Sequence, residues 1–235
     1  CNEVKLEGTA QFSESELKTL RELSTGFDVK DALRVKEFEK KTNHDVKAVE
    51  YFIKENLEAH PKIAQMSEFI HFGCTSEDIN NLAYALLLKD FETKEYLPLI
   101  SGVVLELYNL AKKHAAVALL SRTHGQPASP TTIGKELINF VARLETQIES
   151  LKRIKKLGKF SGAVGNFNAH NIAYPEVDWD GVSQRFITYL GLVPNRYTTQ
   201  IEPHDWMVET FDAVSRINTI LIALNRDVWM YISYD

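Results

Sequence analysis

The apolar residues recur at steps of three and four along most of the chain, the spacing that places side chains on one face of an α-helix. The sequence predicts helices at about 14–23, 29–41, 46–60, 63–70, 79–118, 130–157, 179–190 and 206–235. Pro98 predicts a kink or a break in the fifth of these segments. Gly158 follows a lysine-rich run and is expected as the C′ residue of the sixth. The predicted fold class is all-α, with three helices of roughly 25–40 residues.

Short capping motifs mark where several of these helices are expected to begin. Ser13 followed by Glu16 forms a capping box, in which each side chain accepts a hydrogen bond from the other residue's backbone N–H. Ser129-Pro130 is expected to open the sixth helix, because proline suits the first helical position. The other expected N-caps are Asp28, Thr75 or Ser76, and Asp205.

The composition favours long helices over turns and excludes several classes of partner. The 11 glycines and 7 prolines account for 18 of 235 residues, under 8%, where about 12% is usual. The net charge is −5, and no stripe of Lys or Arg alternates with aromatic residues, so no nucleic-acid partner is expected. No run of 18 apolar residues occurs, so no membrane partner is expected either.

The cysteines and the first residues bear on location and completeness. Cys1 and Cys74 form neither a disulfide framework nor a zinc motif, which favours a reducing compartment and predicts a cytoplasmic location. The first five residues do not resemble a signal peptide, and they lack an initiator Met. Because the helical pattern also continues to residue 235, we expect this chain to be a piece of a longer protein.

Four polar islands interrupt the helical pattern, at residues 71–78, 121–127, 161–170 and 198–204. They concentrate imidazole, hydroxyl and amide side chains in loops between helices, where binding and catalytic sites usually lie. Any one histidine taken alone is as well explained as a helix cap or a loop residue. Five of the seven histidines lie in these islands or in the break near residue 44, namely His44, His71, His124, His170 and His204.

The spacing of these residues argues against several chemistries. No His-x-x-x-His or Cys-x-x-Cys pattern indicates zinc. There is no Gly-x-Ser-x-Gly elbow and no Walker loop, and residues 162–165 hold too few glycines for a dinucleotide fingerprint. What remains is proton transfer by imidazole, with hydroxyl and amide groups holding an anionic substrate.

Four segments resemble motifs of the adenylosuccinate lyase family. They are Asn43–Glu50, His71–Asn81, Ser121–Pro127 and Thr199–Asp205. The Thr-x-His-Gly pattern of the third segment alone indicates only the wider fumarase and aspartase superfamily. The runs Asn-His-Asp-Val-Lys-Ala and Gln-Ile-Glu-Pro-His-Asp point to this family, in the branch common in bacteria and plants. The resemblance covers the chain from about residue 39 onward.

The resemblance implies a fold, an assembly and an activity. The fold is a long-helix bundle, with residues 1–70 ending an N-terminal helical domain and residues 71–235 forming an incomplete central bundle. The assembly is a homotetramer whose active sites are shared between subunits. The activity is β-elimination of fumarate from adenylosuccinate to give AMP, and from the succinylated aminoimidazole carboxamide ribotide to give its carboxamide, in purine biosynthesis. No cofactor and no metal are implied.

The resemblance also implies roles for individual residues. His124 matches the family histidine that acts as the general acid, and an imidazole in that role is typically worth 10²–10⁴ in rate. Thr75 and Ser76 match positions that bind substrate, where hydroxyls and helix N-terminal N–H groups can hold a carboxylate. The family's other site positions fall on Asn43, His44, Asp45, Gln200 and, without an assigned role, His71. Asn168 and His170 are expected to organise their loop, with a contact to substrate as the alternative.

The family's serine base lies on a Ser-Ser-x-Met-Pro-x-Lys loop that this sequence does not contain. The family's early Arg-Tyr pair and its later phosphate-binding Ser and Arg are also missing. The 235-residue piece alone is therefore expected to be inactive. Two alternatives stay open, which are another lyase of the superfamily, such as argininosuccinate lyase, and a non-catalytic helical scaffold that only oligomerises.

The last predicted helix carries an unusually wide apolar surface. Seven residues alternate in steps of four and three and form a predicted heptad seam, namely Thr210, Val214, Ile217, Leu221, Leu224, Val228 and Tyr231. Further apolar and amide residues, including Phe211, Asn218 and Ile232, lie on an adjoining face. A helix that is apolar over so wide an arc is buried on more than one side, either in the core of a monomer or in a bundle between subunits.

Overall fold

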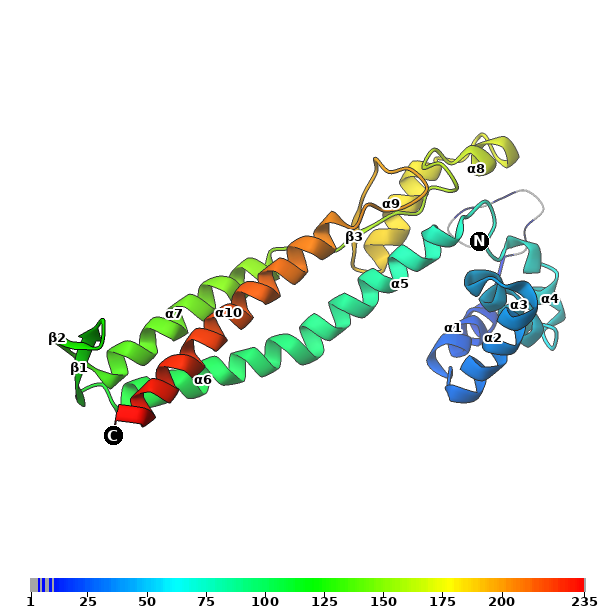
Figure 1. Ribbon diagram of the computed structural model, residues 1–235. Coiled ribbons are helices and arrows are strands. Elements are labelled where there is room, and N and C mark those ends of the chain that lie inside the picture. Colours follow the sequence, from blue (N-terminus) through cyan, green and yellow to red (C-terminus); the bar gives the residue numbers. More distant parts are fainter. Residues whose placement is uncertain (1–3, 5, 7–8, 10, 235) are drawn as a thin grey trace. The chain divides into compact units, whose positions relative to one another are not determined.

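The computed structural model describes residues 4, 6, 9 and 11–234, and most of them are helical (Figure 1). The helices are α1 (Glu14–Thr25), α2 (Val29–Thr42), α3 (Asp45–Leu57), α4 (Pro61–Ala64), the 3₁₀ turn η1 (Ser67–Phe69), α5 (Ser76–Phe91), the π-helical η2 (Glu92–Tyr96), α6 (Leu97–Lys113), α7 (Ile133–Lys152), α8 (Asn168–Ala173), α9 (Trp179–Tyr189) and α10 (Asp205–Tyr234). The strands are β1 (Ala118–Thr123), β2 (Gln126–Thr132), β3 (Leu157–Gly158) and β4 (Val193–Pro194). The predicted all-α class is confirmed, with two small two-stranded sheets added.

The chain divides into two compact units, and the division falls inside α5. Unit 1 consists of Cys1–Ala85 and Leu157–Pro203, and unit 2 consists of Leu86–Lys156 and His204–Asp235. Each unit is therefore assembled from two separate stretches of sequence. Among the described residues, no helix is both long enough and apolar enough to cross a membrane.

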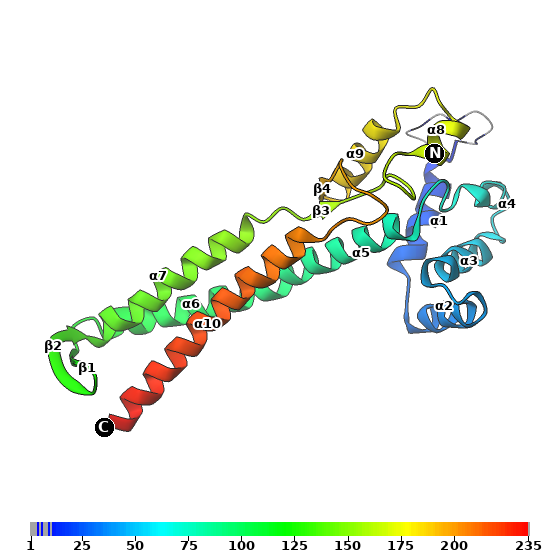
Figure 2. The same cartoon turned by 45° about the horizontal axis from the view of Figure 1, so that its top comes forward.

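Unit 1 begins with short helices whose starts follow local capping chemistry. The Ser13 capping box is present, and Asp28 accepts hydrogen bonds from two N–H groups in the first turn of α2, as predicted. Helices α2 and α3 lie side by side (Figure 2). The ring of Phe27 packs edge-on against the ring of Phe52, with the ring centroids 5.7 Å apart. The long stretch 157–203 supplies α8, α9 and the parallel pair of β3 with β4.

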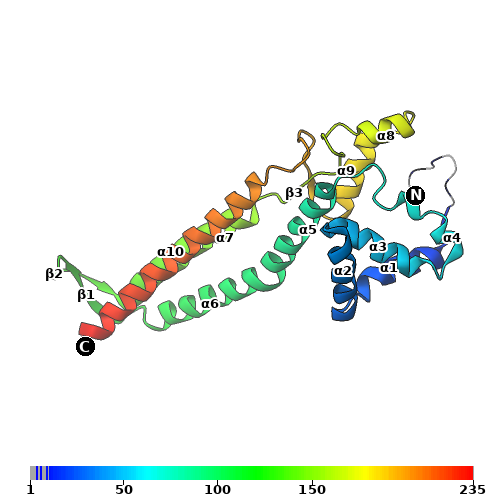
Figure 3. The ribbon, with the colours of Figure 1, turned by 45° about the vertical axis from the view of Figure 1, so that its right-hand side comes forward.

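Unit 2 is built on long helices. Helices α6 and α10 both pack against α7, and α7 and α10 run side by side in all three ribbon views (Figure 3). The buried positions of α7 recur at helical spacing, at Phe140, Val141, Leu144, Ile148 and Leu151. The helical run from Ser76 to Lys113 is not broken at Pro98. A π-helical turn at Glu92–Tyr96 precedes that proline, which lies in the first turn of α6, where its missing N–H is tolerated.

The island at residues 121–127 forms a β-hairpin, which the sequence analysis did not predict. Strands β1 and β2 pair antiparallel, with Thr123 opposite Gln126. The expectation that Ser129-Pro130 opens a helix is wrong, because both residues lie in β2 and α7 begins at Ile133 with Thr132 as its N-cap. Proline is accommodated here because each strand of a two-stranded sheet is an edge strand.

The sixth predicted helix ends earlier than expected. Helix α7 stops at Lys152, and Gly158 lies in β3 rather than at a helix C′ position. A Cβ atom on residue 158 would lie 2.6 Å from Leu82 Cδ2, so any larger residue there would force the Leu82 side chain to shift. The lysines expected to cap the helix dipole include Lys156, which instead forms a buried ion pair with Glu92 at 2.6 Å.

The predicted seam of α10 is buried within this chain at three of its seven positions. Thr210, Ile217 and Leu224 are buried, but Ala213 and Ile220 complete the buried row in place of Val214 and Leu221. A second row on α10 is exposed in this chain and follows the same heptad spacing. Its apolar members are Val208, Phe211, Ile222, Trp229 and Ile232.

Candidate active site

The N-terminus of α5 brings together predicted site residues from three separate motifs. The side-chain amide of Gln200 donates to Thr75 Oγ1 at 3.2 Å. Ser76 Oγ lies 3.1 Å from His44 Nε2. Because Thr75 and Ser76 stand at the start of a 16-residue helix, their hydroxyls lie beside N–H groups that have no intrahelical partner. This group, Thr75, Ser76, His44 and Gln200, is called the hydroxyl cluster below.

His44 is held by the helix that it caps. The backbone N–H of Lys47 donates to His44 Nδ1 at 3.3 Å, so His44 is the N-cap of α3. With Nδ1 accepting, a neutral imidazole carries its proton on Nε2 and donates it to Ser76 Oγ. Asn43 ends α2 with a left-handed backbone, φ +49°, and Asp45 is the first residue of α3, its carboxylate 3.3 Å from His44 Nδ1.

His71 and Cys74 line an apolar recess of about 460 Å³ in unit 1. Burial lowers the pKa of His71 below its ordinary value, so its imidazole is neutral at pH 7. Burial raises the pKa of the Cys74 thiol to about 12, and the nearby carboxylate of Asp78 adds to this effect. Aromatic rings form much of the remaining wall, including Phe72 and Trp179.

His170 is the third residue of α8 and the last residue of the polar island 161–170, which it was expected to organise. Its imidazole is 1% exposed and packs against the ring of Trp179 at 4.8 Å and the ring of Phe72 at 5.7 Å. Asn168 is the first residue of the same helix. Burial lowers the pKa of His170, although the charge of Asp78 acts in the opposite direction. His170 is therefore a packed, neutral side chain of unit 1.

His124 lies in unit 2, at the turn between β1 and β2. It has φ +51°, and Gly125 has φ +75°. Two consecutive positive φ values in a two-residue hairpin loop are those of a type I′ turn. The hairpin therefore presents the His124 side chain at its tip, and Arg122 Nη1 donates to the Gly125 carbonyl at 3.4 Å.

Backbone strain concentrates at the predicted site residues. Among the described residues, five that are not glycine have positive φ: Asn43, His71, His124, Phe167 and His204. Such conformations cost of order 1–3 kcal/mol each and persist only where the surrounding structure holds them. Three of the five, Asn43, His71 and His124, are predicted site residues.

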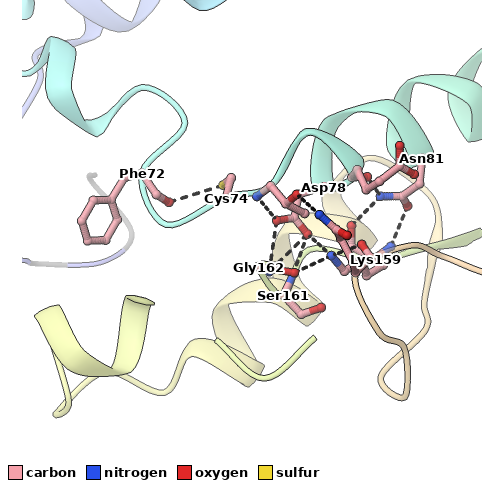
Figure 4. Close-up of polar contacts among 10 residues, drawn as sticks. Phe72, Cys74, Asp78, Asn81, Lys159, Ser161 and Gly162 are labelled. Carbon is pink, nitrogen blue, oxygen red and sulfur yellow. Dashed lines mark hydrogen bonds and ion pairs between the residues drawn. The ribbon is translucent and has the colours of Figure 1, made fainter. Parts of the chain in front are cut away.

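The polar residues beneath the hydroxyl cluster were not predicted from the sequence. Asp78, Asn81 and Lys159 form a buried network in unit 1, in which the carboxylate of Asp78 lies 2.8 Å from Lys159 Nζ (Figure 4). Both of these side chains are fully buried. The sequence offers a partial signal, since Asp78 stands three residues after Thr75, the spacing of a capping box. Among the described residues, no group of three or more His, Cys, Asp or Glu side chains is arranged to hold a metal ion.

A sequence model of the protein family described as Lyase matches residues 2–235. The chain belongs to the lyase family. This lyase chain is 52% identical to adenylosuccinate lyase of Escherichia coli (strain K12), over 94% of the chain and 49% of that protein. It is 54% identical to adenylosuccinate lyase of Haemophilus influenzae, over 88% of the chain and 45% of that protein. It spans about half the length of the curated relatives it matches, and the predicted resemblance to adenylosuccinate lyases is confirmed.

Two solved structures resemble this lyase chain in fold. A fumarate lyase from Mesorhizobium sp. BNC1 aligns with a TM-score of 0.75 at 20% identity, covering 94% of this chain and 50% of that one. The β-carboxy-cis,cis-muconate cycloisomerase of Acinetobacter calcoaceticus sp. ADP1 aligns with a TM-score of 0.71 at 17% identity, covering 93% and 50%. At these identities the likeness shows the fold alone.

Proposed function

We propose that the full-length gene product is an adenylosuccinate lyase, which releases fumarate from adenylosuccinate to give AMP and cleaves the succinylated aminoimidazole carboxamide ribotide in the same way. The observation that carries this proposal is the hydroxyl cluster, where side chains from three of the four family motifs meet at the N-terminus of α5. The identity of 52% to the Escherichia coli enzyme extends over all four motifs and supports the same reaction.

The hydroxyl cluster suits the dicarboxylate part of such a substrate. A carboxylate at the start of α5 would accept hydrogen bonds from the Thr75 and Ser76 hydroxyls and from unpaired N–H groups, in the favourable field of the helix dipole. Gln200 directs its amide toward Thr75 Oγ1 and so stands beside the same position. In the neutral tautomer whose Nδ1 accepts from Lys47, His44 Nε2 donates to Ser76 Oγ and leaves that oxygen's own proton for the carboxylate.

The elimination needs one base and one acid. The base removes a proton from the carbon next to a carboxylate, the bond between carbon and nitrogen breaks, and the electron pair of the departing nitrogen takes a proton from the acid. We assign the acid to His124, an exposed residue in the type I′ turn at the tip of the hairpin. The family's serine base does not occur in these 235 residues, so we expect the 235-residue chain alone to release no fumarate.

We further propose a homotetramer with shared active sites. The exposed row of α10 supports this assembly, because Phe211 is 56%, Ile222 54% and Trp229 75% exposed in the isolated chain. Apolar residues at heptad spacing along a 30-residue helix are suited to a bundle of helices from several subunits. In such an assembly His124 of one subunit would serve the hydroxyl cluster of another.

The purified full-length gene product tests the function directly. We expect AMP and fumarate from adenylosuccinate, detected by chromatography, and no fumarate from argininosuccinate. Release of fumarate from argininosuccinate alone would assign the chain to another lyase of the superfamily. An intact assembly that turns over neither compound would favour the non-catalytic scaffold.

A further inference from the structure

The ammonium group of Lys159 holds two loops of unit 1 that are distant in sequence. It donates to the carbonyl oxygens of Gly162 and Gln200, each at 2.7 Å, and pairs with Asp78 at 2.8 Å. All three of its protons therefore have an acceptor, and the side chain is fully buried. The contact with Gln200 is to the backbone of the residue whose side chain reaches Thr75 in the hydroxyl cluster.

The carboxylate of Asp78 fixes the other side of the cluster. Its Oδ2 accepts from the backbone N–H of Thr75 at 2.8 Å, and its Oδ1 accepts from that of Ser161 at 2.9 Å. Both oxygens also face the N–H of Gly162, at 3.0 and 3.3 Å. Because Asp78 receives the Thr75 backbone N–H, the first turn of α5 is held in place while the Thr75 hydroxyl meets Gln200.

Asn81 holds the backbone from which the Lys159 side chain extends. Its Oδ1 accepts from the Lys159 N–H at 2.8 Å, and its Nδ2 donates to the Lys159 carbonyl at 2.9 Å and to that of Glu77. Asn81 lies one turn after Asp78 on α5, and it is 1% exposed. Helix α5 thus contacts Lys159 twice, through Asn81 at the backbone and through Asp78 at the ammonium group.

A buried ion pair is a poor means of stabilising a fold, because removing two charges from water opposes their attraction and apolar side chains of similar volume often serve as well. Apolar side chains cannot fix the directions of backbone N–H and carbonyl groups. The contacts of Lys159 and Asp78 reach the backbone of Thr75, residues 161 and 162, and Gln200, which come from three different islands. The ion pair therefore fixes the positions of these three islands relative to one another, which apolar side chains could not do.

We propose that Asp78 and Lys159 are positioning residues of the active site, and that their buried ion pair sets the separation and orientation of Thr75 and Gln200 for the substrate's carboxylate. Asn81 supports the pair by fixing the Lys159 backbone. The inference rests on the proposed function for its substrate, but the placement of the islands has a readout that needs no substrate.

The test compares two buried ion pairs in the full-length gene product. The first variant combines Lys159→Met with Asp78→Asn, which removes both charges and leaves neither partner alone. The matched control combines Lys156→Met with Glu92→Gln, which removes the buried pair of unit 2. We expect the first variant to raise KM for adenylosuccinate by about 10- to 100-fold, with a smaller change in kcat, since a displacement of about 1 Å can cost this much. The control should change KM less than about threefold.

Amide hydrogen exchange supplies the readout without substrate. In the first variant, exchange should quicken at least about tenfold in residues 75–78, 161–162 and 199–201, while the control leaves these segments unchanged. Equal KM values in the two variants, or unchanged exchange in the three segments, would overturn the proposal. If the first variant does not fold, Asn81→Ala replaces it. An unchanged KM together with an unchanged exchange pattern in Asn81→Ala would also overturn the proposal. A wild-type protein that is inactive on adenylosuccinate would refute the proposed function. The exchange data would still show whether the ion pair positions the three segments.

Discussion

The imidazole of His170 lies so close to the backbone of Gly73 that a Cβ atom on residue 73 would be 2.7 Å from Nε2. Gly73 also has φ +65°, which disfavours any other residue. We expect Gly73→Ala to lower the free energy of unfolding by about 2–4 kcal/mol, because strained backbone and overpacking act together. Denaturant unfolding of the full-length gene product measures this loss.

Gly125→Ala is the matched control for Gly73→Ala. Gly125 has φ +75°, but a Cβ atom there meets nothing within 4 Å, so the substitution carries only the backbone cost of about 1 kcal/mol. The difference between the two variants isolates the contact with His170. Equal losses would mean that His170 does not require glycine at residue 73.

His124→Gln in the full-length gene product tests the general acid. We expect kcat to fall by at least about a hundredfold and KM to change much less, because the proton is transferred in the transition state. Thr75→Ser serves as a comparison, since it keeps the hydroxyl and should change both constants only slightly. A His124→Gln enzyme that retains a third of the wild-type kcat would remove this residue from the acid role.

The exposed row of α10 predicts how assembly can be disrupted. Phe211→Asp combined with Ile222→Asp places charges on that row without touching the buried row, so the tetramer should dissociate and activity should disappear with it. Charges at Leu224 would instead damage the packing within the chain, where that residue is 7% exposed. Val29→Asp with Leu33→Asp, on exposed apolar residues of α2, is the control. Light scattering that finds an intact, active tetramer in the α10 variant would contradict the proposed bundle.

Cys74 should be an unreactive thiol. With a pKa of about 12, it carries far less thiolate at pH 8 than an ordinary cysteine, and the thiolate is the form that reacts. We expect iodoacetamide to label it about a thousandfold more slowly than free cysteine at pH 8, with a rate that rises about tenfold per pH unit up to pH 11. Mass spectrometry of the Cys74 peptide follows the reaction, and labelling that levels off near pH 9 would disprove the raised pKa.

Helix starts and the polar islands could be predicted because their signals are local. The Ser13 capping box needs only a residue three positions later, and Asp28 needs only the N–H groups two and three residues later to cap α2. The island around Thr75 was located for the same reason. Each of these features is decided by a few neighbouring residues.

The hairpin and the network beneath the cluster depend on information that local patterns lack. The turn at His124-Gly125 has a weaker hairpin signature than Asn-Gly, and Pro127 and Pro130 argue against a strand unless it is known to be an edge. Lys159 follows Gly158, just beyond the lysine-rich run that was expected to end a helix, and its acceptors lie on residues 78, 162 and 200. Only the folded chain brings those acceptors together.

The left-handed backbones of His71 and His124 lower the stability of the fold at two residues that are predicted to belong to the active site. Glycine at either position would relax the backbone by about 1 kcal/mol and would remove the imidazole at the same time. Selection for thermal survival alone should therefore drift toward glycine at these positions, while selection for turnover should retain histidine. A library of variants sorted once for thermal stability and once for growth that depends on the proposed activity would show at which of these positions stability and activity compete.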